Sequence, residues 1–386
     1  MQELREIVAR AARGRAVGER LVLATLVSVR GSHYRKPGAR MLLAPDRPVG
    51  EATGVLSGGC LEGDLAERAR RVAARGEPEI AEYDLSRSGD ALWGFGLGCS
   101  GVVTILVEPL AVEATAGSLA FVERCLLRRE RGALATLFAG EPTADADRRT
   151  PGRWWALDRA GTTSGDLDPT LAGELAPALR AALDGAPAQV VEVERANGRA
   201  SLLVEPIAPP VSFVIGGAGR DAVAMAQAAR SLGWEVTLVD PQALDDTAAR
   251  FAGVDHLVAG PLHGLARRLF LGPRAAAVVM THRYLDDLAL LEELLPLGFD
   301  YLGLLGPRAR RERLLGDLAS RGSAPTPAQR ACLFGPAGLD LGSEGPTEIA
   351  VAVIAEALAV LSRREARSLA AVADTIAAQG LVPAAG

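Results

Sequence analysis

Apolar residues recur along this chain with two alternating periods, most clearly in its second half. Between residues 211 and 320, short apolar runs such as "SFVIGG" alternate with segments of helical period such as "RDAVAMAQAARS". This alternation is typical of a doubly wound parallel sheet with helices on both faces. The expected strands and helices alternate over residues 211–216, 220–232, 235–240, 243–251, 254–259, 262–270, 275–281, 285–296, 301–305 and 308–320. A further helix is expected over 346–361, because Pro346 suits a first helical turn.

The first hundred residues alternate apolar strands with glycine-rich loops. The β-branched run "RLVLATLVSVR" (20–30) predicts a buried strand, and "ARMLLAP" (39–45) predicts the next one. The segment "LEGDLAERARRVAARG" has the helical period, and "VVTILVEP" is a strand behind a second glycine-rich turn. The expected fold class is therefore α/β: an N-terminal α/β domain with glycine-cysteine loops, then a C-terminal Rossmann-like doubly wound parallel sheet.

Residues 111–208 predict an extension made of a helix and a hairpin. The helix is expected over 115–131, followed by strands at "ALATLFA" and "RWWALD". Asn197-Gly198 lies between two β-rich runs and suits a two-residue hairpin turn. The segments "TILVEPL" and "SLLVEPI" look alike, which is at most a hint that the two strands end in the same way.

A proline-rich segment, "PIAPP" at 206–210, is the best domain boundary in the chain. We expect an N-terminal domain over 1–208, a Rossmann-like domain over 209–362 and a helical tail over 363–386.

Composition excludes several classes of protein. The net charge of −5 over 386 residues gives no broad electrostatic attraction to nucleic acid. The chain has no apolar run of the roughly 18 residues that a membrane span needs and no signal-peptide pattern, so we expect a cytoplasmic protein. Its cysteines are dispersed without a CxxC spacing, which argues against a zinc module or a disulfide framework. They are Cys60, Cys99, Cys125 and Cys332, and we expect them to be thiols.

The start of the second half has the features of a dinucleotide-binding loop. Gly217, Gly219 and Ala222 form a GxGxxA pattern directly after a strand, and Asp240 closes the next strand. Backbone N–H groups would hold a phosphate there, and Asp240 would bind a ribose hydroxyl. His282 follows a later strand, at the edge where ligands of such sheets bind. The alternative is that the glycines only allow tight packing and that His282 caps a helix.

Two glycine-cysteine loops and one donor-rich loop occur within the first hundred residues. The donor-rich loop is "GSHYRKPGAR" (31–40), and Cys60 in "SGGCLEGD" lies where a glycine turn meets a helix N-terminus. Unpaired N–H groups and the helix dipole attract negative charge at such a position. Cys99 lies in the similar loop "GLGCSG". The alternative is that both cysteines are small residues in tight turns.

Five motifs together resemble the XdhC/CoxI family, accessory proteins for molybdenum hydroxylases such as xanthine dehydrogenase and carbon monoxide dehydrogenase. They are "GSHYRKPGARML", "SGGCLEGD", "WGFGLGCSG", "GPR" after a strand, and "GLDLGSEGPTEIAVAVIAEALA". The resemblance implies a maturation factor that binds the molybdenum cofactor (molybdopterin), protects it during sulfuration by a cysteine desulfurase and delivers it to the hydroxylase apoenzyme. We also expect a homodimer.

The resemblance further implies which residues hold the cofactor. They are Gly31, Ser32, Arg35, Gly38, Arg40, Ser57, Gly58, Gly59, Cys60, Glu62, Gly98 and Cys99. Cys60 and Cys99 are the candidate contacts to molybdenum, and Lys36 is an adjunct to the two arginines. Arg220 and the segment "DPQ" at 240–242 depart from the family's pattern, so a role for NAD(P) in the Rossmann half stays open.

Two other functions remain open. One is an NAD(P)-dependent oxidoreductase that uses the Rossmann domain, with His282 as acid or base. The other is a sulfur-transfer protein that carries a persulfide on Cys60.

Overall fold

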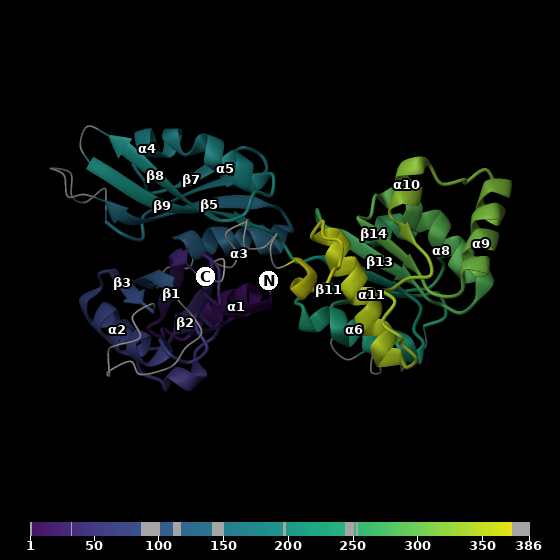
Figure 1. Ribbon diagram of the computed structural model, residues 1–386, viewed down its shortest axis with the longest axis horizontal. Coiled ribbons are helices and arrows are strands. Elements are labelled where there is room, and N and C mark those ends of the chain that lie inside the picture. Colours follow the sequence, from purple (N-terminus) through teal and green to yellow (C-terminus); the bar gives the residue numbers. More distant parts are fainter. Residues whose placement is uncertain are drawn as a thin grey trace. The chain divides into compact units, whose positions relative to one another are not determined.

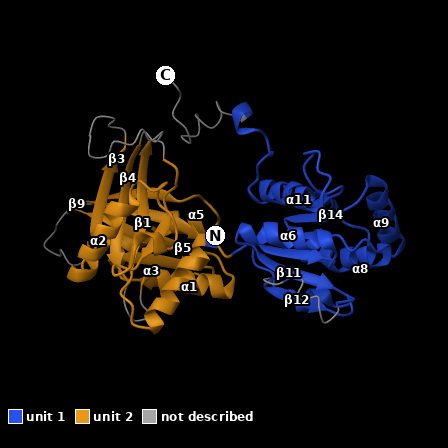
Figure 2. Cartoon of the chain, turned by 90° about the horizontal axis from the view of Figure 1, so that it is seen from below, with its two compact units in different colours: residues 1–2, 210–371 blue, residues 3–209, 372–386 orange. Residues whose placement is uncertain are grey.

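A computed structural model describes residues 2–31, 33–85, 101–110, 117–140, 150–195, 198–243, 251 and 254–372. The chain forms two compact units (Figure 2). One comprises Met1–Gln2 and Pro210–Ala371, the other Glu3–Pro209 and Val372–Gly386. The chain passes from one unit to the other within the proline-rich segment 206–210.

The C-terminal unit contains a six-stranded parallel sheet, as the alternating pattern predicts (Figure 1). Its strand order is β12-β11-β10-β13-β14-β15. The strands are β10 (Ser212–Gly216), β11 (Glu235–Asp240), β12 (His256–Ala259), β13 (Ala275–Val279), β14 (Tyr301–Leu304) and β15 (Leu333–Phe334). The chain order reverses between β11 and β13, on either side of β10, so this edge is the switch point of a Rossmann-like sheet.

Helices cover both faces of this sheet. One face packs against α6 (Arg220–Ser231) and α11 (Pro346–Leu361). The other packs against α8 (Tyr284–Leu294) and α9 (Arg308–Ser320). The short elements are η3 (Leu265–Arg268), η4 (Leu295–Leu297), α10 (Pro327–Ala331) and η5 (Leu369–Val372).

The prediction of a helix over 262–270 is wrong, because only the 3-10 turn η3 forms there. Gly264 has a φ of 72°, a left-handed conformation that interrupts a right-handed helix. Leu262, Leu265 and Leu269 are buried, so the segment packs against the sheet without being helical. Most of the helix expected over 243–251 and the end of the chain after 372 lie outside the described residues.

The N-terminal unit contains two antiparallel sheets, with strand orders β2-β1-β4-β3 and β7-β6-β5-β9-β8. The first sheet consists of β1 (Val22–Gly31), β2 (Arg40–Leu43), β3 (Glu79–Asp84) and β4 (Gly101–Pro109). The second consists of β5 (Gly132–Gly140), β6 (Trp154–Asp158), β7 (Thr163–Gly165), β8 (Gln189–Arg195) and β9 (Gly198–Ile207). Strands β8 and β9 are the hairpin that the Asn-Gly turn predicts.

Each sheet of the N-terminal unit is covered by helices of its own, and two further helices, α1 and α3, lie in a core that both sheets share. The helices are α1 (Gln2–Ala16), η1 (Val49–Glu51), α2 (Glu62–Arg75), α3 (Ser118–Arg128), α4 (Pro169–Glu174) and α5 (Ala176–Leu183). Helix α2 packs on the first sheet and α4 and α5 pack on the second. Helices α1 and α3 share one apolar cluster with Leu23 of β1 and Leu134 of β5, so the two sheets are joined through this core.

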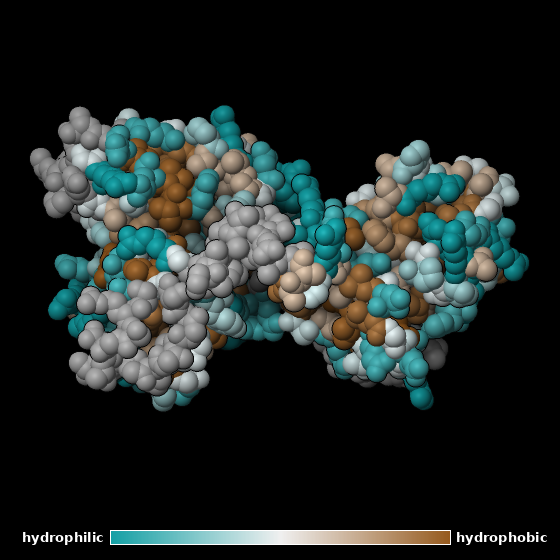
Figure 3. Space-filling view, in the orientation of Figure 1, coloured by the Kyte–Doolittle hydropathy of each residue, from teal (hydrophilic) through white to brown (hydrophobic). Residues whose placement is uncertain are grey.

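No helix among the described residues is long and apolar enough to cross a membrane. On the face seen in Figure 3, hydrophilic and apolar side chains are interspersed over both units.

Candidate functional site

The donor-rich loop after β1 is held by its own residues and by the first helix. The backbone N–H of Arg35 donates to Nδ1 of His33 over 3.1 Å. The guanidinium of Arg35 pairs with Glu3 of α1. Tyr34 projects outward with 70% of its surface exposed, and Lys36 is exposed and pairs with no described residue. Gly31, at the end of β1, is also exposed. The described part of the loop therefore presents the ring of Tyr34 and the ammonium group of Lys36 to solvent.

Arg40 is the first residue of β2, and its side chain points into the interior of the protein. Only 5% of its side chain is exposed. Its Nη1 donates to the carbonyl of Gly38 and to Oε2 of Glu205, each over 3.0 Å, and its Nη2 pairs with Oε1 of the same carboxylate. This bidentate ion pair joins the donor-rich loop to β9 of the second sheet.

The glycine-cysteine loop is shaped by Glu62, the first residue of α2. One Glu62 oxygen accepts from the backbone N–H of Ser57 over 3.0 Å, and the other accepts from the N–H of Leu61 over 3.1 Å and from the Ser57 hydroxyl. Ser57 is buried, and its Oγ also accepts from the N–H of Gly59 over 3.3 Å. A carboxylate that satisfies N–H groups at a helix start fixes the approach of the chain to that helix.

A pocket of about 370 Å³ brings the donor-rich loop and the glycine-cysteine loop together. It is lined by Tyr34, Met41, Val49, Gly50, Ala52, Gly54, Val55, Ser57, Gly58, Gly59 and Glu62. A Cβ added at Gly58 or Gly59 would meet no atom within 4 Å, so packing does not require these glycines. Gly59 has a φ of 109°, which a glycine adopts most easily. The backbone of this loop is thus open to a ligand.

The cysteines are placed differently from one another. Cys60 is a free, half-buried thiol beside the pocket-lining glycines, and part of its surface packs on the core of the first sheet. Cys125 and Cys332 are also free, and burial raises the pKa of Cys125 to about 11. Ser32, Gly98 and Cys99 lie outside the described residues.

The glycine loop of the C-terminal unit lies at the switch point. Gly217 follows β10 with a φ of 122°, and a Cβ there would lie 2.8 Å from the carbonyl oxygen of Met280. Gly217 is therefore required by packing against the end of β13. Gly219 precedes α6, and a Cβ there would meet only the ring of His282, at 3.8 Å. Ala222 lies in the first turn of α6 and is buried in the core between this helix and the sheet.

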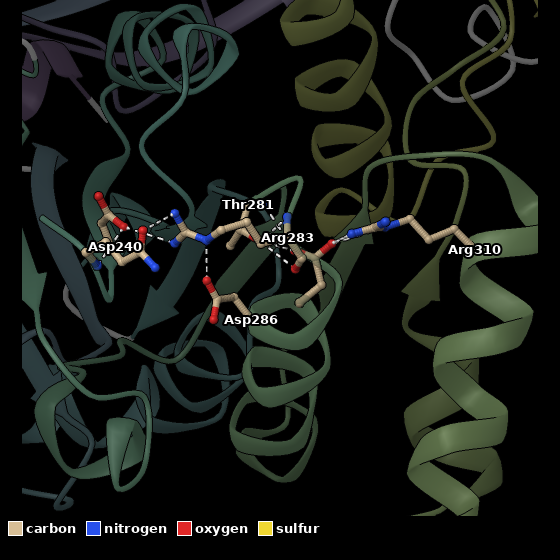
Figure 4. A network of polar contacts seen from close by, with 7 residues as sticks. Asp240, Thr281, Arg283, Asp286 and Arg310 are labelled. Carbon is tan, nitrogen blue, oxygen red and sulfur yellow. Dashed lines mark hydrogen bonds and ion pairs between the residues drawn. The ribbon is translucent and has the colours of Figure 1, made fainter.

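Side chains of the β13–α8 connection reach across the switch point to Asp240. Nη2 of Arg283 lies 3.5 Å from Oδ1 of Asp240, and its Nη1 donates to Gln242 over 2.9 Å (Figure 4). His282 adopts a φ of 60°, and its Nε2 lies 3.4 Å from Asp221 at the start of α6. Both sequence-predicted polar residues, Asp240 and His282, thus already have charged neighbours.

Two buried carboxylates, Asp287 and Glu205, and the half-buried Glu108 have partners or surroundings that reasoning from the local sequence missed. Asp287 of α8 is 1% exposed and accepts from the Thr281 hydroxyl over 2.6 Å and from Arg310 over 2.6 Å (Figure 4). Glu205 holds Arg40. Burial raises the pKa of Glu108, in β4, to about 7, while the charge of Arg40 lowers it and that of Asp166 raises it. The repeated "LVEP" was the only signal that could have identified the two glutamates.

These features define a two-unit protein in which a Rossmann-like unit accompanies an antiparallel unit with a glycine-lined pocket. The family model described as "XdhC Rossmann domain" matches residues 213–357, and "XdhC and CoxI family" matches residues 15–84. The chain belongs to the XdhC and CoxI family, as its motifs predict.

Relatives of known name agree with this membership. The chain is 28% identical over 345 residues to a Bacillus subtilis protein named as a probable subunit of xanthine dehydrogenase, covering 89% of this chain and 94% of the relative. It is 30% identical over 149 residues to "Uncharacterized protein YqeB" of Escherichia coli, covering 38% of this chain and 27% of that protein. A crystal structure described as a xanthine dehydrogenase from Bacillus halodurans has a TM-score of 0.73 and 26% identity, covering 95% of this chain and 98% of that one.

Proposed function

We propose that this protein is an accessory factor in xanthine dehydrogenase maturation that binds the molybdenum cofactor in the pocket of its N-terminal unit. The observation that carries the proposal is the pocket itself. It joins Tyr34, the loop Ser57–Gly59 and Glu62 in a chain whose relatives carry xanthine dehydrogenase names. The protein would protect the cofactor during sulfuration and deliver it to the apoenzyme.

The chemistry of the pocket suits a pyranopterin that carries a phosphate and a molybdenum end. Gly58 offers its backbone N–H group to an oxyanion, and neither Gly58 nor Gly59 places a side chain in the way. Lys36 lies two residues after the pocket-lining Tyr34, and its exposed ammonium group could pair with the phosphate. Cys60 is a soft ligand close to the same glycines. The bound cofactor would supply the reactive centre, while this chain binds, orients and shields it.

The proposed partners follow from that role. They are a molybdenum hydroxylase of the xanthine dehydrogenase type, a cysteine desulfurase and a second copy of the chain, in the cytoplasm.

We expect Cys60→Ala and Arg35→Ala to weaken molybdopterin binding by about tenfold each, because the first removes a soft ligand and the second frees the loop from Glu3. The measurement is equilibrium dialysis of purified protein against molybdopterin. Cys332→Ala and Arg20→Ala are the matched controls, since they alter a free thiol and an ion-paired arginine that do not line the pocket. Equal affinities for all five proteins would refute the site.

The same preparation distinguishes the other two functions. Stoichiometric binding of NAD(H) or NADP(H) with turnover of a carbonyl substrate would establish an oxidoreductase. The ion pair of Arg283 with Asp240 leads us to expect no such turnover. A gain of about 32 Da, one sulfur atom, on Cys60 after reaction with a desulfurase would establish a persulfide carrier.

A further inference from the structure

The two sheets of the N-terminal unit are built from the same sequence of elements. In the first, α1 precedes β1 and β2, and α2 precedes β3 and β4. In the second, α3 precedes β5 and β6, and α5 precedes β8 and β9. The strand orders β2-β1-β4-β3 and β6-β5-β9-β8 also correspond, with β7 added at one edge. The unit is thus an αββαββ module followed by a second one.

The pairing of the central strands corresponds residue by residue. Strand β1 pairs Leu23 with Glu108, and β5 pairs Leu134 with Glu205. Both pairings contain a register shift three residues later, after Leu26 in one and after Leu137 in the other. In this register the segments "LATL" at 23–26 and 134–137 coincide, as do "LVEP" at 106–109 and 203–206.

The turns that lead into the second strand of each copy are also equivalent. Each contains Pro-Gly, at 37–38 and at 151–152. The N–H of Gly38 donates to the carbonyl of Leu26 over 2.8 Å, and the N–H of Gly152 donates to that of Leu137 over the same distance. Their φ angles are 94° and 92°, which favour glycine in both places.

The two copies contact each other reciprocally at these turns. A Cβ at Gly38 would lie 2.7 Å from Oε2 of Glu205, and a Cβ at Gly152 would lie 3.0 Å from Oε2 of Glu108. Each turn therefore lies against the "LVEP" glutamate of the other copy. A small buried cluster between the sheets has the same symmetry, because Val27 and Phe138 are equivalent and so are Leu106 and Leu203.

The copies differ in the segments that line the pocket. Between β2 and α2 the first copy has the glycine-cysteine loop. At the corresponding place the second copy has the edge strand β7 and the helix α4, which is capped by Asp168. The turns differ as well, since Arg40 of the first copy corresponds to Trp154 of the second. Glu205 thus meets a guanidinium in the first copy, whereas Trp154 offers Glu108 none.

We propose that the N-terminal unit is a tandem pair of αββαββ modules in which only the first binds ligand, and that Glu205 of the second module is the positioning residue for the donor-rich loop 31–40. The Glu205 carboxylate packs against Gly38 and pairs with Arg40, so it fixes the positions of both residues of the turn. Glu205 itself does not line the pocket. The proposal rests on the proposed function for the identity of the ligand.

The duplication supplies matched variants that test this role. Gly38→Ala and Gly152→Ala make the same change at equivalent turns, against equivalent glutamates. We expect each to lower Tm by about 3 to 10 °C, the two agreeing within about 2 °C. We expect Gly38→Ala to weaken molybdopterin binding by about tenfold and Gly152→Ala to leave it within about twofold of wild type. Equal losses of binding would overturn the proposal.

A second matched pair tests the glutamate directly. Glu205→Asp shortens the side chain by one methylene and keeps its charge, and Glu108→Asp makes the same change in the other module. We expect only Glu205→Asp to weaken molybdopterin binding, by about tenfold, with the protein still folded. Unchanged binding by this variant would exclude positioning. If the wild-type protein binds no molybdopterin, the proposed function fails. If Gly38→Ala and Gly152→Ala lower Tm by different amounts, the two turns are not structurally equivalent and the duplication is refuted.

Discussion

Replacing Glu205 with glutamine is expected to lower the free energy of unfolding by about 3 kcal/mol. The substitution leaves the guanidinium of Arg40 charged and almost fully buried, with the Gly38 carbonyl and an amide oxygen in place of a carboxylate. Breaking one side of a buried ion pair is costly because the remaining charge has lost its hydration and its counter-charge together. Urea unfolding monitored by circular dichroism at pH 7 measures the change.

Two control variants separate this effect from a general sensitivity to substitution. Glu192→Gln removes an exposed ion pair with Arg199 in the same sheet, and we expect it to change the free energy by less than about 1 kcal/mol. Arg40→Met combined with Glu205→Leu replaces the buried pair by apolar side chains, and we expect it to recover most of the loss. A single Glu205→Gln variant as stable as wild type would show that Arg40 is not dependent on that carboxylate.

The elements of this protein were largely predictable because their periodicity is local. The helix Pro346–Leu361 and the strand Glu235–Asp240 have the limits that their apolar patterns and first-turn proline predict. The segment 262–270 has the same apolar spacing and does not form the helix. In this segment the left-handed conformation of Gly264 interrupts the helix, and the buried leucines pack on the sheet without it, so the apolar spacing does not produce a helix.

The partners of the candidate site residues were less predictable than their positions. The sequence places Ser57, Gly58, Gly59 and Glu62 in one loop, and the structure gathers them around one pocket. The family resemblance also implies that Arg40 holds the cofactor, but the carboxylate that pairs with Arg40 lies 165 residues away in another sheet. No local pattern contains such a contact. Only a comparison of the two "LVEP" segments, extended to the strands beside them, indicates that the unit is duplicated.

Glu108 occupies the place equivalent to Glu205, but the position that corresponds to Arg40 on its facing turn is Trp154, and the arginine of that turn, Arg153, pairs with Asp166. Gly152 leaves room for the Glu108 carboxyl. Burial therefore outweighs the attraction of Arg40 and raises the pKa of Glu108 from 4.5 to about 7.

This raised pKa makes the protein less stable as the pH increases. The folded state keeps the Glu108 proton up to about pH 7, whereas the unfolded state loses it near pH 4.5, so the contribution is complete below pH 4.5 and is lost as the pH rises through 7. We expect Glu108→Gln, which stays neutral, to be more stable than wild type by about 3 kcal/mol at pH 8.5 and nearly equally stable at pH 4.5. Urea unfolding of both proteins at several pH values from 4.5 to 8.5 measures the difference, and parallel pH profiles would refute the assignment. The opposite signs expected for Glu108→Gln and Glu205→Gln at pH 8.5 follow from the partners of the two carboxylates, because Glu205 forms an ion pair with Arg40 whereas the equivalent position beside Glu108 is Trp154.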